Sequence, residues 1–307
     1  MITLLSAPSN LGLRPPEAGS VPGAAKAPEA LREAGLHARF AALGATDSGV
    51  VLAGRYVDDD ATRPPGLVRN ESATIDHSLR LAARIGAALD RGDAPVVLGG
   101  DCAILLGAGL AVARRGGVGL VHVDGHTDFR HPGNSDECAS VAGEALAAAV
   151  GRHWPAIADI EGRSPYFAPE RTAHIGHRSD DEDQEEVRAF LGRVTPASDI
   201  IERGAARVAA DAAAVAGPDY WLQVDVDVLD PEVMPAVDSP DPGGIRAPEL
   251  TTLLQELAPH AVGISITVFD PDLDPDGRYA RLLVDILTAG LTDLGSRVRR
   301  DDGGVPG

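Results

Sequence analysis

Three residues with metal-binding chemistry occupy alternate positions near the middle of the chain. Residues 119–129 carry an apolar run followed by Asp124, His126 and Asp128. Side chains along a strand alternate between its two faces, so an extended backbone as far as Asp128 would direct all three the same way. Two carboxylates and an imidazole that converge at a strand end are a typical set of metal ligands.

A second segment repeats this pattern about a hundred residues later. Asp225 and Asp227 are again two positions apart, after the apolar run of residues 220–224. Capping of helices and turns is the ordinary role of such aspartates. It explains these poorly, because unpaired charges at buried strand ends are very costly without a cation. Together the two segments predict one shared metal centre.

The elements that must position these residues alternate between short apolar strands and helices. Strands are expected at 2–6, 49–53, 95–98, 118–124, 171–176, 219–226 and 261–268. Helices are expected at 28–35, 70–89 (with Asn70 as N-cap), 103–114, 139–150, 181–191, 200–215, 247–257 and 278–294. The alternation predicts a three-layer α/β fold, a mostly parallel sheet of about eight strands with helices on both faces.

Strand ends locate the site within this fold. Ligands of open α/β sheets lie beyond the carboxyl ends of the strands. Asp101, Asp124 and Asp225 all fall at predicted carboxyl ends, so topology and ligand chemistry point to the same place. No segment reads as a linker, and we expect a single domain over 1–307 with a mobile tail from about residue 296.

Composition and net charge exclude several kinds of binding partner. The chain has 307 residues and a net charge of −19, with 27 basic against 46 acidic residues, which argues against nucleic acid or an anionic membrane. Its two cysteines give no disulfide framework. No apolar stretch approaches the ~20 residues of a membrane span, and the first residues do not resemble a secretory signal. We expect a cytoplasmic protein that acts on a small molecule.

Three motifs in order identify a family resemblance. The sequences GGDC, VDGHTDF and VDVDVLDP resemble those of the arginase/agmatinase (ureohydrolase) family. The early PEALREAGL, the IGHR segment and the Gly-Gly pair that closes residues 230–244 fall in the same family order. The resemblance covers most of the chain and implies the family's arginase-like fold, with a homo-oligomer as a possible assembly.

The resemblance also implies a binuclear metal centre, usually of manganese. Asp124 and Asp225 would bridge two ions, and His126 and Asp227 would complete the shell of one. The other ion would be held by Asp128 and by the residue after Asp101. Most family members have histidine at that last position.

This chain has Cys102 there instead. An oxygen-rich ligand set suits Mn²⁺, whereas a thiolate shifts the preference towards Zn²⁺ or Fe²⁺. We expect Cys102 to ligate metal. The alternative is a small buried apolar side chain that leaves this position weak or empty.

Two further departures concern catalysis and substrate. The resemblance implies a bridging water that attacks an sp² carbon, and the catalytic candidates are Asp128 and His131. His131 would replace the family's acid/base histidine, whose position holds Ala142; a surface loop histidine is the alternative. Val268 stands where the family's guanidinium-binding glutamate would be, which removes a bidentate ion pair.

The resemblance implies substrate contacts at His177, Asp181 and Val268; solvent-exposed charge on a loop and a helix start is the alternative for the first two. His122, one step deeper in the strand, reads as a core histidine or a support of the ligands. The function favoured is hydrolysis of a guanidino, N-hydroxyguanidino, ureido or related amide C–N bond. A catalytically silent metal-binding or ligand-binding relative and an amide deacetylase of the same fold are the alternatives.

Overall fold

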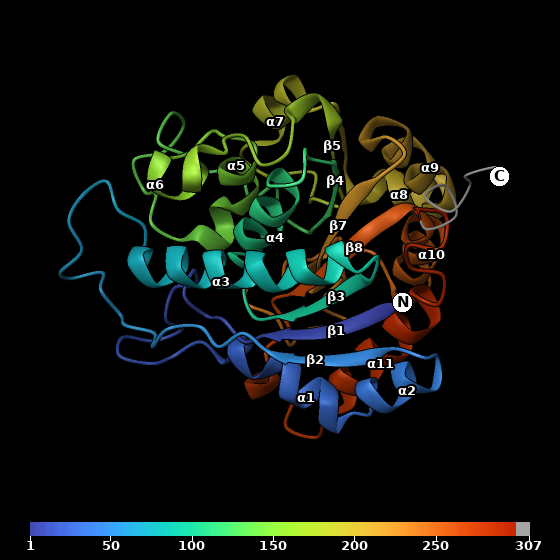
Figure 1. Cartoon of the computed structure of the whole chain (residues 1–307). Helices are drawn as coiled ribbons and strands as arrows, with labels where there is room; N and C mark the ends of the chain where they lie inside the picture. Colours follow the sequence, from blue (N-terminus) through green and yellow to red (C-terminus); the bar gives the residue numbers. More distant parts are fainter. Residues whose placement is uncertain (299–307) are drawn as a thin grey trace.

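The computed structural model describes residues 1–298, and within them eight strands form a single sheet (Figure 1). The strands lie in the order β2-β1-β3-β8-β7-β4-β5-β6, and every pairing is parallel. In chain order they are Ile2–Ala7, Thr46–Val50, Ala94–Gly99, Gly119–Val123, Thr172–Ile175, Arg193–Thr195, Tyr220–Asp225 and Ala261–Thr267. The sheet confirms the predicted class.

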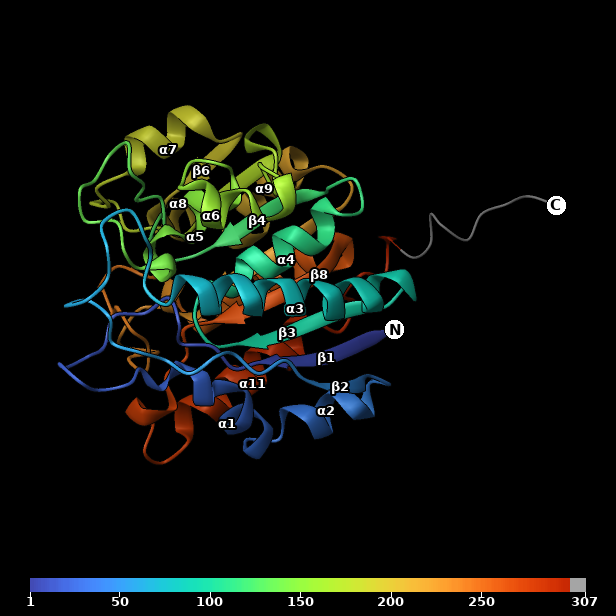
Figure 2. The same ribbon diagram turned by 60° about the vertical axis from the view of Figure 1, so that its left-hand side comes forward.

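The helices form two packed groups, and the two views place them on opposite faces of the sheet (Figures 1 and 2). The group that contains α3 and α4 covers β3, β7 and β8, while α9, α10, α11, α1 and α2 pack in succession on the other face. The bounds of α1 to α11 are Ala27–Glu33, Leu36–Ala42, Glu71–Asp90, Ile104–Ala113, Ala145–Ala149, Pro155–Ala158, Gln184–Phe190, Ala197–Arg203, Ala205–Ala216, Ala247–Leu257 and Arg278–Gly290.

Burial follows from position in the three layers. The central strands β3, β4 and β7 are buried throughout, as expected for parallel strands covered on both faces. Helix α4 is apolar on every side and buried from Ile104 to Val112, because it packs between α3 and the sheet. The edge strand β2 is largely exposed.

Four expectations about the elements need correction. Strand β2 occupies Thr46–Val50 rather than 49–53, and β6 at Arg193–Thr195 was not predicted. The helix expected at 200–215 is two helices, α8 and α9, separated by Gly204 at a φ of 88°, which favours glycine. Asn70 does not cap α3 with its side chain, since its Oδ1 accepts from the Val57 N–H instead.

The segment after α11 is hydrogen-bonded to the turn that precedes β8. The backbone N–H of Arg297 donates to the Pro259 carbonyl at 2.9 Å, so the segment after α11 follows the fold past residue 296. The rest of the predicted mobile tail, residues 299–307, lies outside the described residues. A single domain over 1–307 stays a prediction. No helix among residues 1–298 is both long and apolar enough to cross a membrane.

Sheet order brings the predicted ligands to one edge. Strands β3, β8, β7 and β4 are consecutive neighbours, so the segments that follow them leave the sheet side by side. Val123 pairs with Val224 in register, and the next residues on the two strands are Asp124 and Asp225. The aspartates on which the predicted centre depends are therefore neighbours across two strand ends.

Candidate metal centre

The segment after β4 is a tight turn and not an extended strand. β4 ends at Val123, and Asp128 has a φ of 49°, so the expectation of extended backbone as far as Asp128 was wrong. Hydrogen bonds fold the turn: the His126 N–H donates to Asp124 Oδ1 at 2.7 Å, and the Thr127 N–H donates to Asp181 Oδ2 at 2.9 Å. Side-chain acceptors thus shape the backbone that presents the ligands.

The segment after β7 is shaped in the same way. Asp225 Oδ1 accepts from the Asp227 N–H at 2.9 Å and caps a short 3-10 turn over Val226–Val228. Asp227 in turn accepts from the Gly125 N–H and from His126 Nδ1, at 3.0 and 2.8 Å. The two strand ends are bonded to each other through these groups.

Potential ligand atoms gather in three groups that share Asp124. They are Cys102 with Asp124 and Asp225, His122 with Asp124 and Asp128, and His126 with Asp124 and Asp227. In each group the donor atoms lie within 4.8 Å of one another. The structure therefore brings together all six predicted metal ligands, together with His122.

The electrostatics of this cluster favour a bound cation. The pKa values of Asp124 and Asp225 are both raised well above the ordinary value of an aspartate. Burial is the largest cause, and repulsion from neighbouring carboxylates is the next. Burial also raises the pKa of Asp128. Burial alone would raise the pKa of Asp227 as well, but the hydrogen bond from His126 lowers it.

Unsatisfied atoms give an independent test of whether metal ions fit. Asp124 Oδ2, Asp128 Oδ2 and His122 Nε2 are buried and have no hydrogen-bond partner among the described residues. Buried polar atoms almost always have a partner, and exceptions call for a water or an ion. Carboxylate oxygens and imidazole nitrogens are suitable donors for divalent metals, so these residues fit the ions that the sequence predicts.

Cys102 lies at the carboxyl end of β3, just before α4. Its thiol donates to Asp225 Oδ2 at 2.6 Å and lies 3.4 Å from Thr267 Oγ1. Burial, followed by the nearby carboxylates, raises the pKa of this thiol well above its ordinary value. The preceding Asp101 accepts from the N–H groups of Gly12 and Ala103, each at 2.9 Å, and so ties the loop after β1 to the site.

A cavity of about 420 Å³ opens above the cluster. Asp181 and Val268, two of the predicted substrate contacts, line it, and so do His126, Asp128 and Ala142. Asp181 is held in place by Thr127, whose Oγ1 donates to Asp181 Oδ1 at 2.7 Å. Val268 has a φ of 71°, which is rare for a β-branched residue.

Two of the predicted catalytic and substrate-contact residues, His131 and His177, are not in the cavity wall. His131 Nε2 lies 3.0 Å from Glu186 Oε1, and its Nδ1 accepts from the Gly133 N–H, so both ring nitrogens are engaged. His177 is fully buried and stacks on His174 with ring centroids 5.1 Å apart. The geometry does not favour a catalytic role for His131 or a substrate contact for His177.

The sequence prediction overlooked His174, which completes a row of three buried histidines, and it gave no role to Arg178. The rings of His122, His174 and His177 pack against one another in succession beside the cluster. His122 and His174 pair across β4 and β5, and His177 follows β5, so the row could be found only once the strand order was known. Arg178 donates to the carbonyls of Asp227 and Asp241, each at 2.8 Å. It thereby holds the 230–244 loop against the site.

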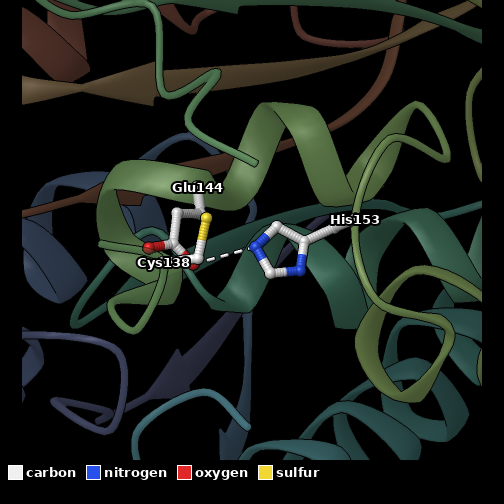
Figure 3. Close-up of side chains that lie close together, drawn as sticks. All are labelled: Cys138, Glu144 and His153. Carbon is white, nitrogen blue, oxygen red and sulfur yellow. Dashed lines mark hydrogen bonds and ion pairs between the residues drawn. The ribbon is translucent and has the colours of Figure 1, made fainter. Parts of the chain in front are cut away.

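Cys138, Glu144 and His153 form a fourth cluster (Figure 3), and none of the three belongs to the cavity lining. Its hydrogen bonds are complete: the N–H groups of Ala139 and Ser140 donate to Glu144 Oε1 at 2.7 and 2.9 Å. The Trp154 N–H donates to His153 Nδ1, so Nε2 carries the proton that faces Glu144 Oε2. This cluster holds the 138–144 turn and lacks the unsatisfied atoms of the metal centre.

An all-parallel α/β sheet with a buried carboxylate cluster at its carboxyl edge defines an α/β protein with a candidate divalent-metal site. Comparison with known proteins gives the family: the profile of the arginase family matches residues 2–291, and the chain belongs to that family. The arginase of Bacillus caldovelox is 29% identical over 227 residues, which cover 72% of this chain and 76% of that protein. A formimidoylglutamase of Halobacterium salinarum is 28% identical, covering 83% and 77%.

Solved structures agree with this assignment. The native arginase structure from Bacillus caldovelox superposes with a TM-score of 0.84 at 27% identity, covering 94% of this chain and 97% of that one. The chain is thus a metal-dependent hydrolase of the ureohydrolase type. Neither a silent relative nor an amide deacetylase is favoured.

Proposed function

We propose that this enzyme holds two divalent metal ions and hydrolyses a C–N bond of a modified guanidino group or of a related ureido or formimino group. The observation that carries the proposal is the buried cluster centred on Asp124, which opens into a cavity. Asp124 and Asp225 would bridge the ions, with His126 and Asp227 on one of them. Asp128 would hold the other, with Cys102 in reach as the remaining predicted ligand.

Manganese is the proposed metal because most of the ligand atoms are carboxylate oxygens, although the Cys102 thiol would suit Zn²⁺ or Fe²⁺. A divalent pair supplies a water that loses its proton near neutral pH. Asp128 is the proposed catalytic residue: it lines the cavity, and its carboxylate would accept a hydrogen bond from the attacking water. Asp181, fixed by Thr127, would hold a donor group of the substrate.

The cavity wall suggests the charge of the substrate. Asp180, Asp181, Glu182 and Asp183 line one part of it, and Arg14 and Arg130 also belong to the lining. Within the described residues neither arginine forms an ion pair. A substrate with a carboxylate and an amino group at one end would satisfy both kinds of side chain.

Val268 affects which reacting group of a substrate the cavity can bind. This apolar side chain in the wall offers no carboxylate to a guanidinium, so the loss of the bidentate pair weakens binding of an unmodified cation. An N-hydroxyguanidine, a ureido compound or a formimino compound does not depend on that pair. We therefore place unmodified arginine below these compounds as a substrate.

The experiment loads purified enzyme with Mn²⁺, measures bound metal, and assays guanidino, N-hydroxyguanidino, ureido, formimino and amide amino acids for released urea, hydroxyurea or ammonia. We expect turnover of an N-hydroxyguanidino, ureido or formimino substrate and loss of turnover in Asp225→Asn. Asp136→Asn, the same change on an exposed loop, is the control. A full metal complement with no turnover of any compound would refute the proposal.

Location and assembly complete the proposal. We place the enzyme in the cytoplasm, which agrees with two cysteines that form no disulfide. A homo-oligomer is supported by the exposed apolar side chains of Val50, Leu52 and Val57 on and after the edge strand β2. Light scattering of the loaded enzyme would measure the subunit number.

A further inference from the structure

We infer that His122 is itself a metal ligand, which supplies through Nε2 a nitrogen to the ion held by Asp124 and Asp128. The inference rests on the proposed binuclear centre and adds to it a ligand from inside β4. Cys102, the residue after Asp101, offers the metal a sulfur atom in place of a histidine nitrogen. His122 would return an imidazole to the same ion from a different strand.

Three unsatisfied atoms meet at this point. His122 Nε2, Asp124 Oδ2 and Asp128 Oδ2 are all buried without a hydrogen-bond partner among the described residues. Donor atoms of the same three residues lie within 4.8 Å of one another. One cation would satisfy all three, whereas each atom left unpaired would keep its full desolvation penalty.

A direct hydrogen bond from His122 to Asp124 does not explain the arrangement. His122 Nε2 lies 3.5 Å from Asp124 Oδ2, longer than a normal N–H···O bond. Both side chains are almost completely buried, at 0% and 1% exposure, so solvent does not take the place of a partner. The spacing leaves room for an ion that both atoms contact.

The other ring nitrogen of His122 has the partner that metal ligation requires. His122 Nδ1 lies 2.9 Å from His174 Nδ1, and the two residues are in register on β4 and β5. A proton on His122 Nδ1, donated to His174, leaves the lone pair on Nε2. Ligating histidines commonly donate their second N–H in this way, which fixes the tautomer and the ring orientation.

Cys102 occupies a different part of the centre. It follows β3, and its thiol is already bonded to Asp225 Oδ2, while His122 approaches Asp124 and Asp128 from within β4. The thiol therefore has a protein partner, and the imidazole nitrogen has none.

The first experiment titrates metal-free protein with Mn²⁺ by calorimetry and counts bound ions by elemental analysis. We expect two ions in the wild type. In His122→Phe one ion remains, and the other binds about 100-fold more weakly or is lost. This loss of affinity is larger than most losses caused by substituting a residue that only hydrogen-bonds to a metal ligand. His260→Phe, at a histidine bonded to the Pro218 carbonyl away from the cavity lining, keeps both ions.

The second experiment detects the nitrogen directly, so that the inference is still tested if His122→Phe does not fold. In Mn²⁺-loaded His126→Gln, His122 is the remaining imidazole of the site, and pulsed electron paramagnetic resonance should still show coupling to a coordinated nitrogen. Absence of that coupling, or two ions bound with unchanged affinity in His122→Phe, would overturn the inference. A wild type that binds no metal would instead refute the proposed function.

Discussion

Val268 is the residue at which local conformation and function conflict most clearly. Its side chain is buried and lines the cavity, and its φ is 71°. A β-branched side chain in the left-handed region costs on the order of 1–3 kcal/mol. The Val268 N–H donates to the Gly100 carbonyl at 2.7 Å, so the segment that carries Cys102 holds this backbone in place.

Val268→Glu should restore binding of a guanidinium. The new carboxylate would meet the cation in the cavity wall, and a well-placed ion pair there would raise kcat/KM for unmodified arginine by about tenfold or more. Steady-state assays compare arginine with the best substrate of the wild type. Val268→Gln, of equal size and without charge, is the control, and an equal gain in both variants would contradict the charge argument.

His77 gives a pH effect separate from the metal centre. Burial lowers the pKa of His77 from its ordinary 6.5, and its Nε2 bonds to the Val51 carbonyl at 3.0 Å. The unfolded chain therefore takes up a proton at higher pH than the fold does. This part of the stability is complete above pH 6.5, and it falls as the pH drops towards the folded pKa.

Urea unfolding of metal-free wild type and His77→Gln at about pH 8 and about pH 5.5 measures this effect. The glutamine amide can donate to the same carbonyl but does not titrate. We expect the wild type to lose more stability than His77→Gln between the two pH values. Equal losses would show that His77 titrates normally in the fold.

At the scale of elements, the sequence predicted which segments carry ligands but not the shape of those segments. Alternating ligands suggested an extended strand as far as Asp128, yet Asp124 and Asp181 accept from the backbone and bend the segment into a turn. Asp181 lies more than fifty residues away in sequence. Long-range contacts of this kind leave no local periodicity, and the short edge strand β6 was missed for a similar reason.

Close backbone approach at Gly100 allows the turn after β3 to reach the site. A Cβ there would lie 2.0 Å from the Ser9 carbonyl oxygen. Gly100→Ala should therefore force the loop after β1 away, destabilise the protein by about 1–3 kcal/mol and weaken Mn²⁺ binding. Thermal unfolding and metal titration measure both effects.

Gly143→Ala is the matched control, because a Cβ at Gly143 meets nothing within 4 Å and its φ is not positive. We expect its melting temperature to stay close to that of the wild type. Equal destabilisation by the two substitutions would mean that the approach of Gly100 to Ser9 does not matter.

At the scale of the whole molecule, the chain order of strands could be predicted, but their spatial order could not. Alternating helices and apolar strands indicated the parallel sheet and therefore the edge where ligands meet. The insertion of β8 between β3 and β7 has no local sequence signal, because the central strands all read alike as buried and apolar. The same limitation hid the row formed by His122, His174 and His177, which depends on β4 and β5 being neighbours.

The buried carboxylates of the metal centre destabilise the metal-free fold, and bound metal ions would remove this destabilisation. Burial and the charges of Asp227 and Asp181 raise the pKa of Asp128, so in metal-free protein this carboxyl either repels its neighbours or takes up a proton. Asp128→Asn removes the charge, and asparagine accepts the φ of 49° there. Metal-free Asp128→Asn should therefore melt at a higher temperature than the metal-free wild type.

With metal the order should reverse. Free Mn²⁺ at about one hundred times Kd stabilises a one-site protein by about 2.7 kcal/mol, and Asp128→Asn should lose most of that gain with one of its ions. Calorimetric melting with and without Mn²⁺ measures both differences, and Asp136→Asn should behave like the wild type in each. If Asp128→Asn melted below the wild type in both conditions, the result without metal would contradict the prediction. The Asp128 carboxylate would then stabilise the fold itself, whereas a carboxylate kept only for metal binding should destabilise the metal-free protein by repulsion.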